Sequence, residues 1–146
     1  MRRLTLCGTV ALALCLALPG AADATKIKHR GTLVGVPSAT VKFAVKKKRG
    51  DLKRITKLRF DDVPVTCADG SVGVVFGELR SFGLSGKRFT RKGRIQGIGI
   101  QDGRLRVAGK LRRGGKVAKG KVRVAFKSSS GVGCGTDNRA WKTRKK

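Results

Sequence analysis

The chain has few residues of the kinds that acid–base chemistry uses. Its 146 residues include no tyrosine, one histidine and eight aspartate or glutamate residues. No serine stands in a Gly-x-Ser-x-Gly pattern, and a single histidine is too few for a zinc site with the cysteines. We therefore expect a protein that is not an enzyme and that needs no cofactor and no metal.

Helical patterning is also lacking. No window places apolar residues at positions i, i+3, i+4 and i+7 over three turns, whereas short alternating runs are separated by turns that contain some of the 21 glycines. This pattern predicts an all-β fold. We expect a single antiparallel meander domain of about eight strands, arranged as a β-barrel or a β-sandwich.

Only one long apolar run is present, and it lies at the N-terminus. Two arginines precede the run Leu4–Pro19, and small residues follow up to Ala24, which is the pattern of a secretory signal peptide. We expect residues 1–24 to be removed and residues 25–146 to form the domain. A membrane helix is disfavoured because the run is short, and a lipoprotein anchor at Cys15 is disfavoured because Leu14 precedes it.

Secretion changes how the four cysteines are counted. Cys7 and Cys15 leave with the signal, so the pair Cys67 and Cys134 remains. An even pair in an oxidising compartment predicts one disulfide, and a loop of this length gives about 4 kcal/mol of chain-entropy stabilisation. We expect a secreted or cell-surface protein, periplasmic if the host has an outer membrane, with no transmembrane segment in residues 25–146.

Acidic residues are greatly outnumbered by basic ones. The chain has 35 Lys and Arg residues against 8 acidic residues, a formal net charge of +27. Such a charge opposes compactness and attracts polyanions. The alternative is that the charge serves solubility and has no partner.

The first half of the domain contains several predicted strands and turns. Val41, Phe43 and Val45 alternate with polar residues, and the run Leu52–Cys67 changes parity at Asp61-Asp62, which predicts a bulge there. Turns or loops are expected at four segments: Val36–Ala39, Lys46–Asp51, Ala68–Ser71 and Leu84–Phe89.

Two glycine turns predict the register of the C-terminal meander. Asp102-Gly103 suggests a two-residue loop that would pair Ile100 with Leu105 and Ile98 with Val107. Gly114-Gly115 suggests a second loop, and its predicted pairs are Leu111 with Ala118, Gly109 with Gly120, Val107 with Val122, and Leu105 with Val124. Both loops place the apolar residues on one face.

The opposite face of this meander is basic. We call it the basic face and expect it to bind anions through seven residues: Arg104, Arg106, Lys110, Arg112, Lys119, Lys121 and Arg123. In the predicted register Lys110 lies opposite Lys119, and Arg106 lies opposite Arg123. Like charges placed directly across a strand pair are destabilising. A basic C-terminal tail, residues 142–146, adds to the charge.

Three motifs resemble those of a group of small secreted β-proteins from soil actinobacteria and similar bacteria. They are "VTCADGS" at 65–71, "GKRF" at 86–89 and "GCGTDNRAWKTR" at 133–144. In that group Gly and Ala are expected where Asp137 and Thr143 stand. The resemblance implies an all-β fold, secretion and a Cys67–Cys134 bridge, and it implies no activity.

Four other residues suggest sites that have simpler structural explanations. A Cys67–Cys134 bond would bring Asp69 near Asp137, a weak calcium candidate. An Asx turn at Asp69, and a loop cap or a pairing with Arg139 at Asp137, explain the two carboxylates better. Trp141 fits a core residue beside the disulfide better than a stacking platform for a sugar or base. His29 is expected to be an exposed strand residue.

The sequence leaves three functional hypotheses. We favour a secreted non-catalytic β-domain that associates electrostatically with anionic polymers or surfaces, such as cell-wall polymers, acidic polysaccharides or extracellular DNA. No motif for sequence-specific nucleic-acid binding is present. The alternative is a structural or scaffold protein with no specific ligand, and the third hypothesis is an enzyme or inhibitor of an unrecognised class. The sequence does not indicate an oligomeric state.

Overall fold

The computed structural model describes residues 24–97 and 99–146 and consists almost entirely of strands. The proposed signal peptide therefore lies almost wholly outside the described residues. The strands are β1 (Lys26–Leu33), β2 (Val36–Lys48), β3 (Asp51–Cys67), β4 (Val72–Leu79), β5 (Phe82–Gly83), β6 (Arg88–Gln96), β7 (Ile100–Arg112), β8 (Val117–Ser128) and β9 (Gly133–Lys145), with a 3₁₀ turn, η1 (Arg113–Gly115), between β7 and β8.

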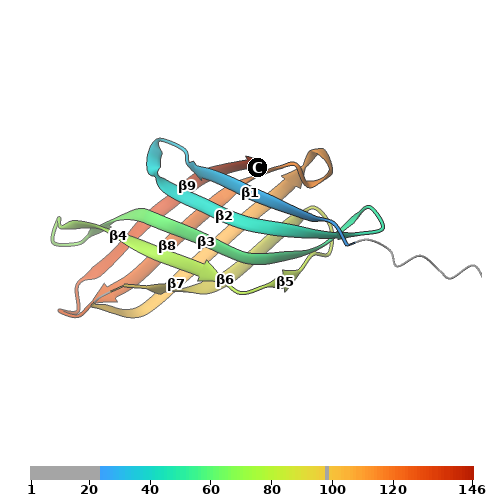
Figure 1. The fold of residues 1–146 in the computed structure, drawn as a ribbon. Coiled ribbons are helices and arrows are strands. Elements are labelled where there is room, and N and C mark those ends of the chain that lie inside the picture. The colour runs from blue at the N-terminus through green and yellow to red at the C-terminus, as the bar shows by residue number, and fades with distance from the viewer. Residues whose placement is uncertain (1–23, 98) are drawn as a thin grey trace, which may run out of the picture.

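The nine strands form one antiparallel sheet that closes into a ring. Their order is β2-β1-β9-β8-β7-β6-β4-β3-β5, and β2 also pairs with β3. The strands β1 to β3 lie on one side of the molecule and cross β7 to β9 behind them at an angle (Figure 1). The predicted all-β fold is confirmed, and the ring is neither two separate sheets nor a clear barrel.

The long strand β3 contains the predicted bulge. Its pairing with β4 shifts between Phe60 and Val63, and Asp62 has a φ of +58°. Leu58 and Phe60 are buried before the shift, and Val63 and Val65 are buried after it. The extra residue therefore explains how apolar side chains of opposite parity all face the core.

The β7–β8 hairpin has the predicted register. Leu111 pairs with Ala118, and the three other predicted pairs are also present: Gly109 with Gly120, Val107 with Val122, and Leu105 with Val124. The Lys116 N–H donates to the Arg113 carbonyl over 3.2 Å, and Gly114 and Gly115 have φ values of +61° and +86°. Both central residues of this turn thus need the left-handed conformation that glycine adopts without strain.

The predicted hairpin at Asp102-Gly103 is wrong. β7 runs through these residues, and Leu105 pairs with Gly93 of β6 rather than with Ile100. Asp102 does have a positive φ, +48°, but it belongs to an irregularity in the β7–β8 ladder between Gln101 and Arg104. A residue with a positive φ is common both in a bulge and in a tight turn. The Asp-Gly pair therefore marks an irregularity within β7 and not the predicted turn.

Other expected boundaries move by a few residues. The first turn lies at Val34-Gly35, before the predicted Val36–Ala39, because Gly35 supplies a φ of +79°. The predicted loop Lys46–Asp51 is a short turn at Arg49-Gly50. Residues 142–146 are not a free tail, since β9 continues to Lys145 and pairs with both β1 and β8. The expected turns at Ala68–Ser71 and Leu84–Phe89 are confirmed, and Phe89 is buried.

Trp141 lies in the middle of the core. It is 1% exposed, and its ring lies 6.1 to 6.4 Å from those of Phe43, Phe60 and Phe89. Two inward-facing glycines, Gly109 and Gly120, make room for it: a Cβ on either would lie within 2.8 Å of the indole Cζ2 atom. The prediction of a core residue is confirmed.

The predicted position of Trp141 beside the disulfide is wrong. The Cys67–Cys134 bond is present and joins directly opposite residues of β3 and β9. Trp141 lies on the same strand as Cys134 but seven residues further along, which is roughly 23 Å at the usual strand rise. The disulfide and the tryptophan therefore stabilise different regions of the ring.

Candidate anion-binding face

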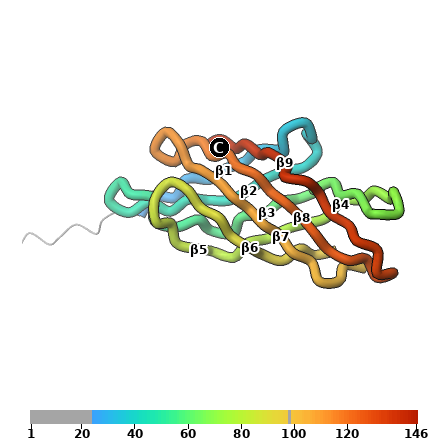
Figure 2. Tube along the Cα trace, turned by 180° about the vertical axis from the view of Figure 1, so that it is seen from behind, coloured from blue at the N-terminus to red at the C-terminus, as the bar shows by residue number. Residues whose placement is uncertain are grey.

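All residues of the basic face lie on the outer side of β7 and β8. These strands run side by side with β9 across the side of the molecule that Figure 2 faces. Arg106 is directly opposite Arg123, and Lys110 is directly opposite Lys119. Arg104, Arg112 and Lys121 are exposed on the same side. The register that the sequence predicted for these cations on β7 and β8 is confirmed.

The structure extends this face by Arg88, which sequence reasoning missed, and by Lys142, which was expected in the basic tail. Arg88 of β6 pairs with Lys110, and Lys142 of β9 pairs with Lys119. We call the line Arg88, Lys110, Lys119 and Lys142 the four-cation row. Adjacent strands are about 4.8 Å apart, so the row crosses four strands in roughly 14 Å.

Lys110 experiences the repulsion within this row. Its pKa is lowered by the charge of Arg88 first and of Arg112 second, with smaller contributions from desolvation, Lys87 and Lys119. Four neighbouring cations thus act on one ammonium group. No described ion pair includes a residue of the four-cation row.

A shallow hollow of about 500 Å³ runs beside the four-cation row. The next row across the strands holds Thr90, Ala108, Lys121 and Ala140, most of which have short side chains. The hollow exists because Thr90, Ala108 and Ala140 have shorter side chains than the cations around them. An extended polymer can therefore reach the backbone level of the sheet here.

The ion pairs of the described residues lie on the other side of the ring. Asp61 accepts from Arg59 Nε over 2.6 Å and from Lys42 Nζ over 3.0 Å, and these three residues are cross-strand or near neighbours on β2 and β3. Burial alone would raise the pKa of Asp61, but the hydrogen bonds and charges of Lys42 and Arg59 outweigh it and hold the pKa below the ordinary value.

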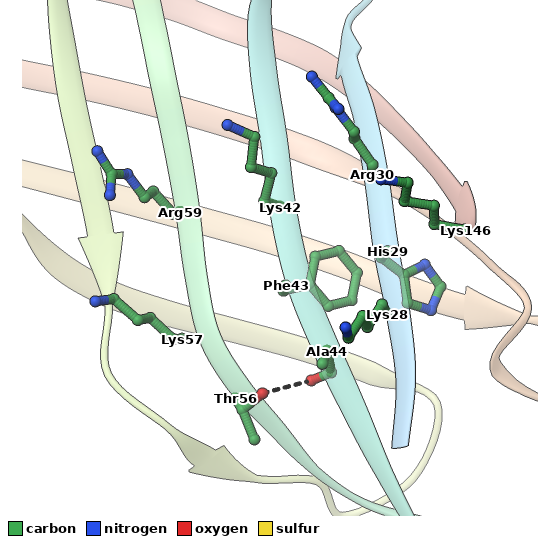
Figure 3. A pocket seen from close by; sticks show the side chains of 10 residues that line it. All are labelled: Lys28, His29, Arg30, Lys42, Phe43, Ala44, Thr56, Lys57, Arg59 and Lys146. Carbon is green, nitrogen blue, oxygen red and sulfur yellow. Dashed lines mark hydrogen bonds between the residues drawn. The ribbon is translucent and has the colours of Figure 1, made fainter. Parts of the chain in front are cut away.

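A second basic hollow lies over β1, β2 and β3 (Figure 3). It encloses about 460 Å³, and its cations are Lys28, Arg30, Lys42, Lys57, Arg59 and Lys146. The Asp61 carboxylate engages Lys42 and Arg59, and Glu78 lies 3.5 Å from Lys57. Half of its cations are thus already paired with carboxylates, so this hollow is a weaker candidate for anions than the four-cation row.

His29 is buried, contrary to the prediction of an exposed residue. It is 3% exposed and stacks on Phe43 with ring centroids 4.5 Å apart. Its Nε2 lies 2.8 Å from the Gly115 carbonyl, and its Nδ1 lies 3.1 Å from the Thr143 hydroxyl. Desolvation by burial lowers the pKa of His29, while the hydrogen bond to Gly115 acts in the opposite direction.

The first carboxylate of the weak calcium candidate, Asp69, is engaged in the predicted Asx turn. The Asp69 Oδ1 atom accepts hydrogen bonds from the N–H and the hydroxyl of Ser71, which is the Asx turn, and these bonds lower the pKa of Asp69. Asp137 is exposed. Within residues 24–97 and 99–146, no group of three or more His, Cys, Asp and Glu side chains is placed to hold a metal ion.

Two further findings concern the chain as a whole. The described segments contain no helix with the length and apolar character that crossing a membrane requires. Comparisons with protein-family models, with curated proteins and with solved structures found no match to this chain.

Proposed function

We propose that the protein binds anionic polymers or anionic surfaces through the outer face of β6, β7, β8 and β9. The observation that carries this proposal is the four-cation row, in which Lys110 and Lys119 face each other between Arg88 and Lys142. Like charges in direct opposition each cost some tenths of a kcal/mol. A polyanion lying along the row would remove this cost and release its own counterions.

The proposed function is non-catalytic and extracytoplasmic. His29 and Asp61, two groups that acid–base chemistry would use, are engaged in hydrogen bonds within the fold. A disulfide persists in oxidising compartments, which supports a location outside the cytoplasm. Candidate partners are cell-wall polymers, acidic polysaccharides and extracellular DNA.

The test compares two matched pairs of charge reversals on a heparin column. Arg106→Glu with Lys110→Glu places acids opposite Arg123 and Lys119. The control, Lys26→Glu with Arg54→Glu, places acids on either side of Lys46, since these three residues also form a like-charge row. Both variants lose the same charge and gain opposite-sign neighbours, so both should fold.

We expect the β7 variant to elute at clearly lower salt than the control variant. With a DNA duplex as ligand, the slope of log Kobs against log salt should become shallower by about 0.9 for each phosphate that the variant no longer neutralises. Equal losses of affinity in the two variants would contradict a specific face and would favour the alternative of a scaffold protein whose bulk charge binds indiscriminately.

A further inference from the structure

A hollow ringed by cations lies where β7 turns into β8, at one end of the basic face, with which it shares Arg112 and Lys119. It encloses about 540 Å³, and its lining consists of Val117 and seven cations: Arg112, Arg113, Lys116, Lys119, Lys142, Arg144 and Lys145. We call it the Val117 hollow. Its volume falls within the range of about 300–1,000 Å³ found for small-ligand sites.

Strand register explains why this hollow exists. Arg112 pairs with Val117, and Val117 pairs with Arg144, so a valine occupies the middle of a cross-strand line whose neighbours are arginines. The two arginine Cα atoms are thus about 10 Å apart at the usual strand spacing. The short, half-buried valine leaves open space between the two guanidinium groups.

The turn and the end of β9 fix the far side of the hollow. The Lys116 N–H donates to the Arg113 carbonyl, and the Lys145 N–H donates to the Lys116 carbonyl over 2.8 Å. The turn glycines, Gly114 and Gly115, hold the backbone in its left-handed conformation. Arg113 and Lys116 are therefore carried by an ordered turn that two strands anchor, so the backbone needs little ordering on binding.

The lining indicates the class of ligand. It contains neither an aromatic side chain on which a base or sugar could stack nor an acidic side chain that could bind a cation. Three of the cations are arginines, whose planar guanidinium groups donate paired hydrogen bonds to phosphate oxygens. The remaining four are lysines, which add positive charge without restricting geometry.

We infer that the Val117 hollow binds a compact chain of phosphate groups, such as inorganic tripolyphosphate. This site goes beyond the proposed function, because most of its residues lie outside the basic face and its ligand is a small anion rather than a polymer. A chain of several phosphates carries more negative charge at neutral pH than a single sulfate ion, and its phosphates can contact several of the cations around Val117.

The test is calorimetric titration with tripolyphosphate, with ATP, and with sulfate at matched ionic strength. We expect saturable binding of tripolyphosphate at one site, binding of ATP that is no tighter, and much weaker binding of sulfate. Sulfate binding of equal strength would overturn the inference of a phosphate site. Tighter binding of ATP would show that a nucleoside is recognised and would also overturn it.

Val117→Glu and Val117→Gln form the matched pair of variants. The glutamate places a carboxylate between Arg112 and Arg144, and it should weaken tripolyphosphate binding by about tenfold or more, since it competes with phosphate for the charge-assisted hydrogen bonds of both arginines. The glutamine has nearly the same size without the charge and should weaken binding only slightly. Equal affinities in the two variants would place the ligand elsewhere.

Two readouts keep this test separate from folding and from the proposed function. Val117→Glu should raise Tm in the absence of ligand, because it creates two opposite-sign cross-strand neighbours. The variant with glutamate at Arg106 and Lys110 should keep its affinity for tripolyphosphate while its heparin retention falls. If wild-type protein binds no tripolyphosphate, the inference fails whatever the result on heparin.

Discussion

His29 connects three parts of the ring through one buried side chain. Its imidazole joins β1 to Thr143 of β9 and to Gly115 of the β7–β8 turn, and it stacks on Phe43 of β2. Because Nε2 faces a carbonyl, it carries a proton, and Nδ1 is left to accept from the Thr143 hydroxyl. Both hydrogen bonds are made by the neutral imidazole. Lys28, Arg30 and Lys146 line the second basic hollow together with His29, and their positive charges disfavour protonation of the ring.

Stability should therefore fall as the pH is lowered past the ordinary histidine value. The folded pKa of His29 lies below 6.5, so the unfolded chain binds more protons than the folded chain below that pH. We expect the free energy of unfolding to drop by up to about 1.4 kcal/mol between pH 7.5 and pH 5.5. Urea denaturation at the two pH values measures it.

The single histidine makes this measurement clean. His29→Gln should be less stable than wild type at both pH values, and its stability should not change between them. Equal stability of the wild type at pH 7.5 and pH 5.5 would show that the imidazole is not held neutral in the fold.

At the scale of the strand, Asp61 separates two kinds of basic surface. Arg30 of β1 lies opposite Lys42 of β2, and Lys42 lies opposite Arg59 of β3, so this line resembles the four-cation row in register. It differs because Asp61, which is 8% exposed, accepts hydrogen bonds from both Lys42 and Arg59. One acid thus compensates the line of like charges on β1 to β3. The four-cation row on β6 to β9 takes part in no described ion pair.

Asp61→Asn should destabilise the protein by about 1–2 kcal/mol, because it removes the charge that both cations need. The value is modest since the Lys42 and Arg59 side chains are about half exposed and solvent screens them. Asp51→Asn is the control, and it should change stability by less than about 0.5 kcal/mol because its partner Lys53 is exposed. Thermal denaturation compares the two, and equal effects would contradict this role of Asp61.

Periodicity predicted the elements in which one face is uniformly apolar. Leu105, Val107 and Leu111 alternate with cations, and the Gly-Gly turn fixes their partners on β8, so the hairpin and its basic face were both accessible from sequence. The position of β6 was not accessible from sequence. A turn at Asp102-Gly103 would place Ile100 beside Leu105, where the structure has Gly93 of β6. The alternation of Arg88, Thr90, Lys92 and Arg94 on the outer side of β6 was the signal that could have corrected this.

The same reasoning missed His29 and the role of residues 142–146. His29 alternates with Ile27 and Leu33, which are both buried, so its parity indicated the core although its polarity suggested solvent. Residues at a chain end carry no turn signal that shows where a strand stops, and β9 acquires its length from pairing with β1 and β8. Neither long-range pairing nor a buried hydrogen-bond partner is encoded locally.

At the scale of the whole molecule, the net charge of +27 opposes folding. Raising NaCl from 0.1 to 1 M shortens the Debye length from about 10 Å to about 3 Å and screens this repulsion. We expect Tm to rise by roughly 5 °C over this range, which corresponds to about 1 kcal/mol for a domain of this size. Scanning calorimetry without any ligand measures the shift.

The double glutamate variant at Arg106 and Lys110 provides the control for this prediction. Because it replaces two like-charge neighbours with opposite-sign neighbours, its Tm should rise less with salt than that of the wild type. A Tm that is independent of salt in the wild type would show that repulsion contributes little to its stability.

The disulfide also determines whether a single proteolytic cut separates the chain into two pieces. The segment between Cys67 and Cys134 includes β4 to β8, and its β7–β8 turn exposes Arg113 and Lys116, residues of the types that trypsin cleaves. A cut at Arg113 or Lys116 would leave two polypeptides joined by the Cys67–Cys134 bond. The cleaved chain would migrate as one species until a reductant is added, so most of the cationic surface would remain attached to the rest of the ring after nicking.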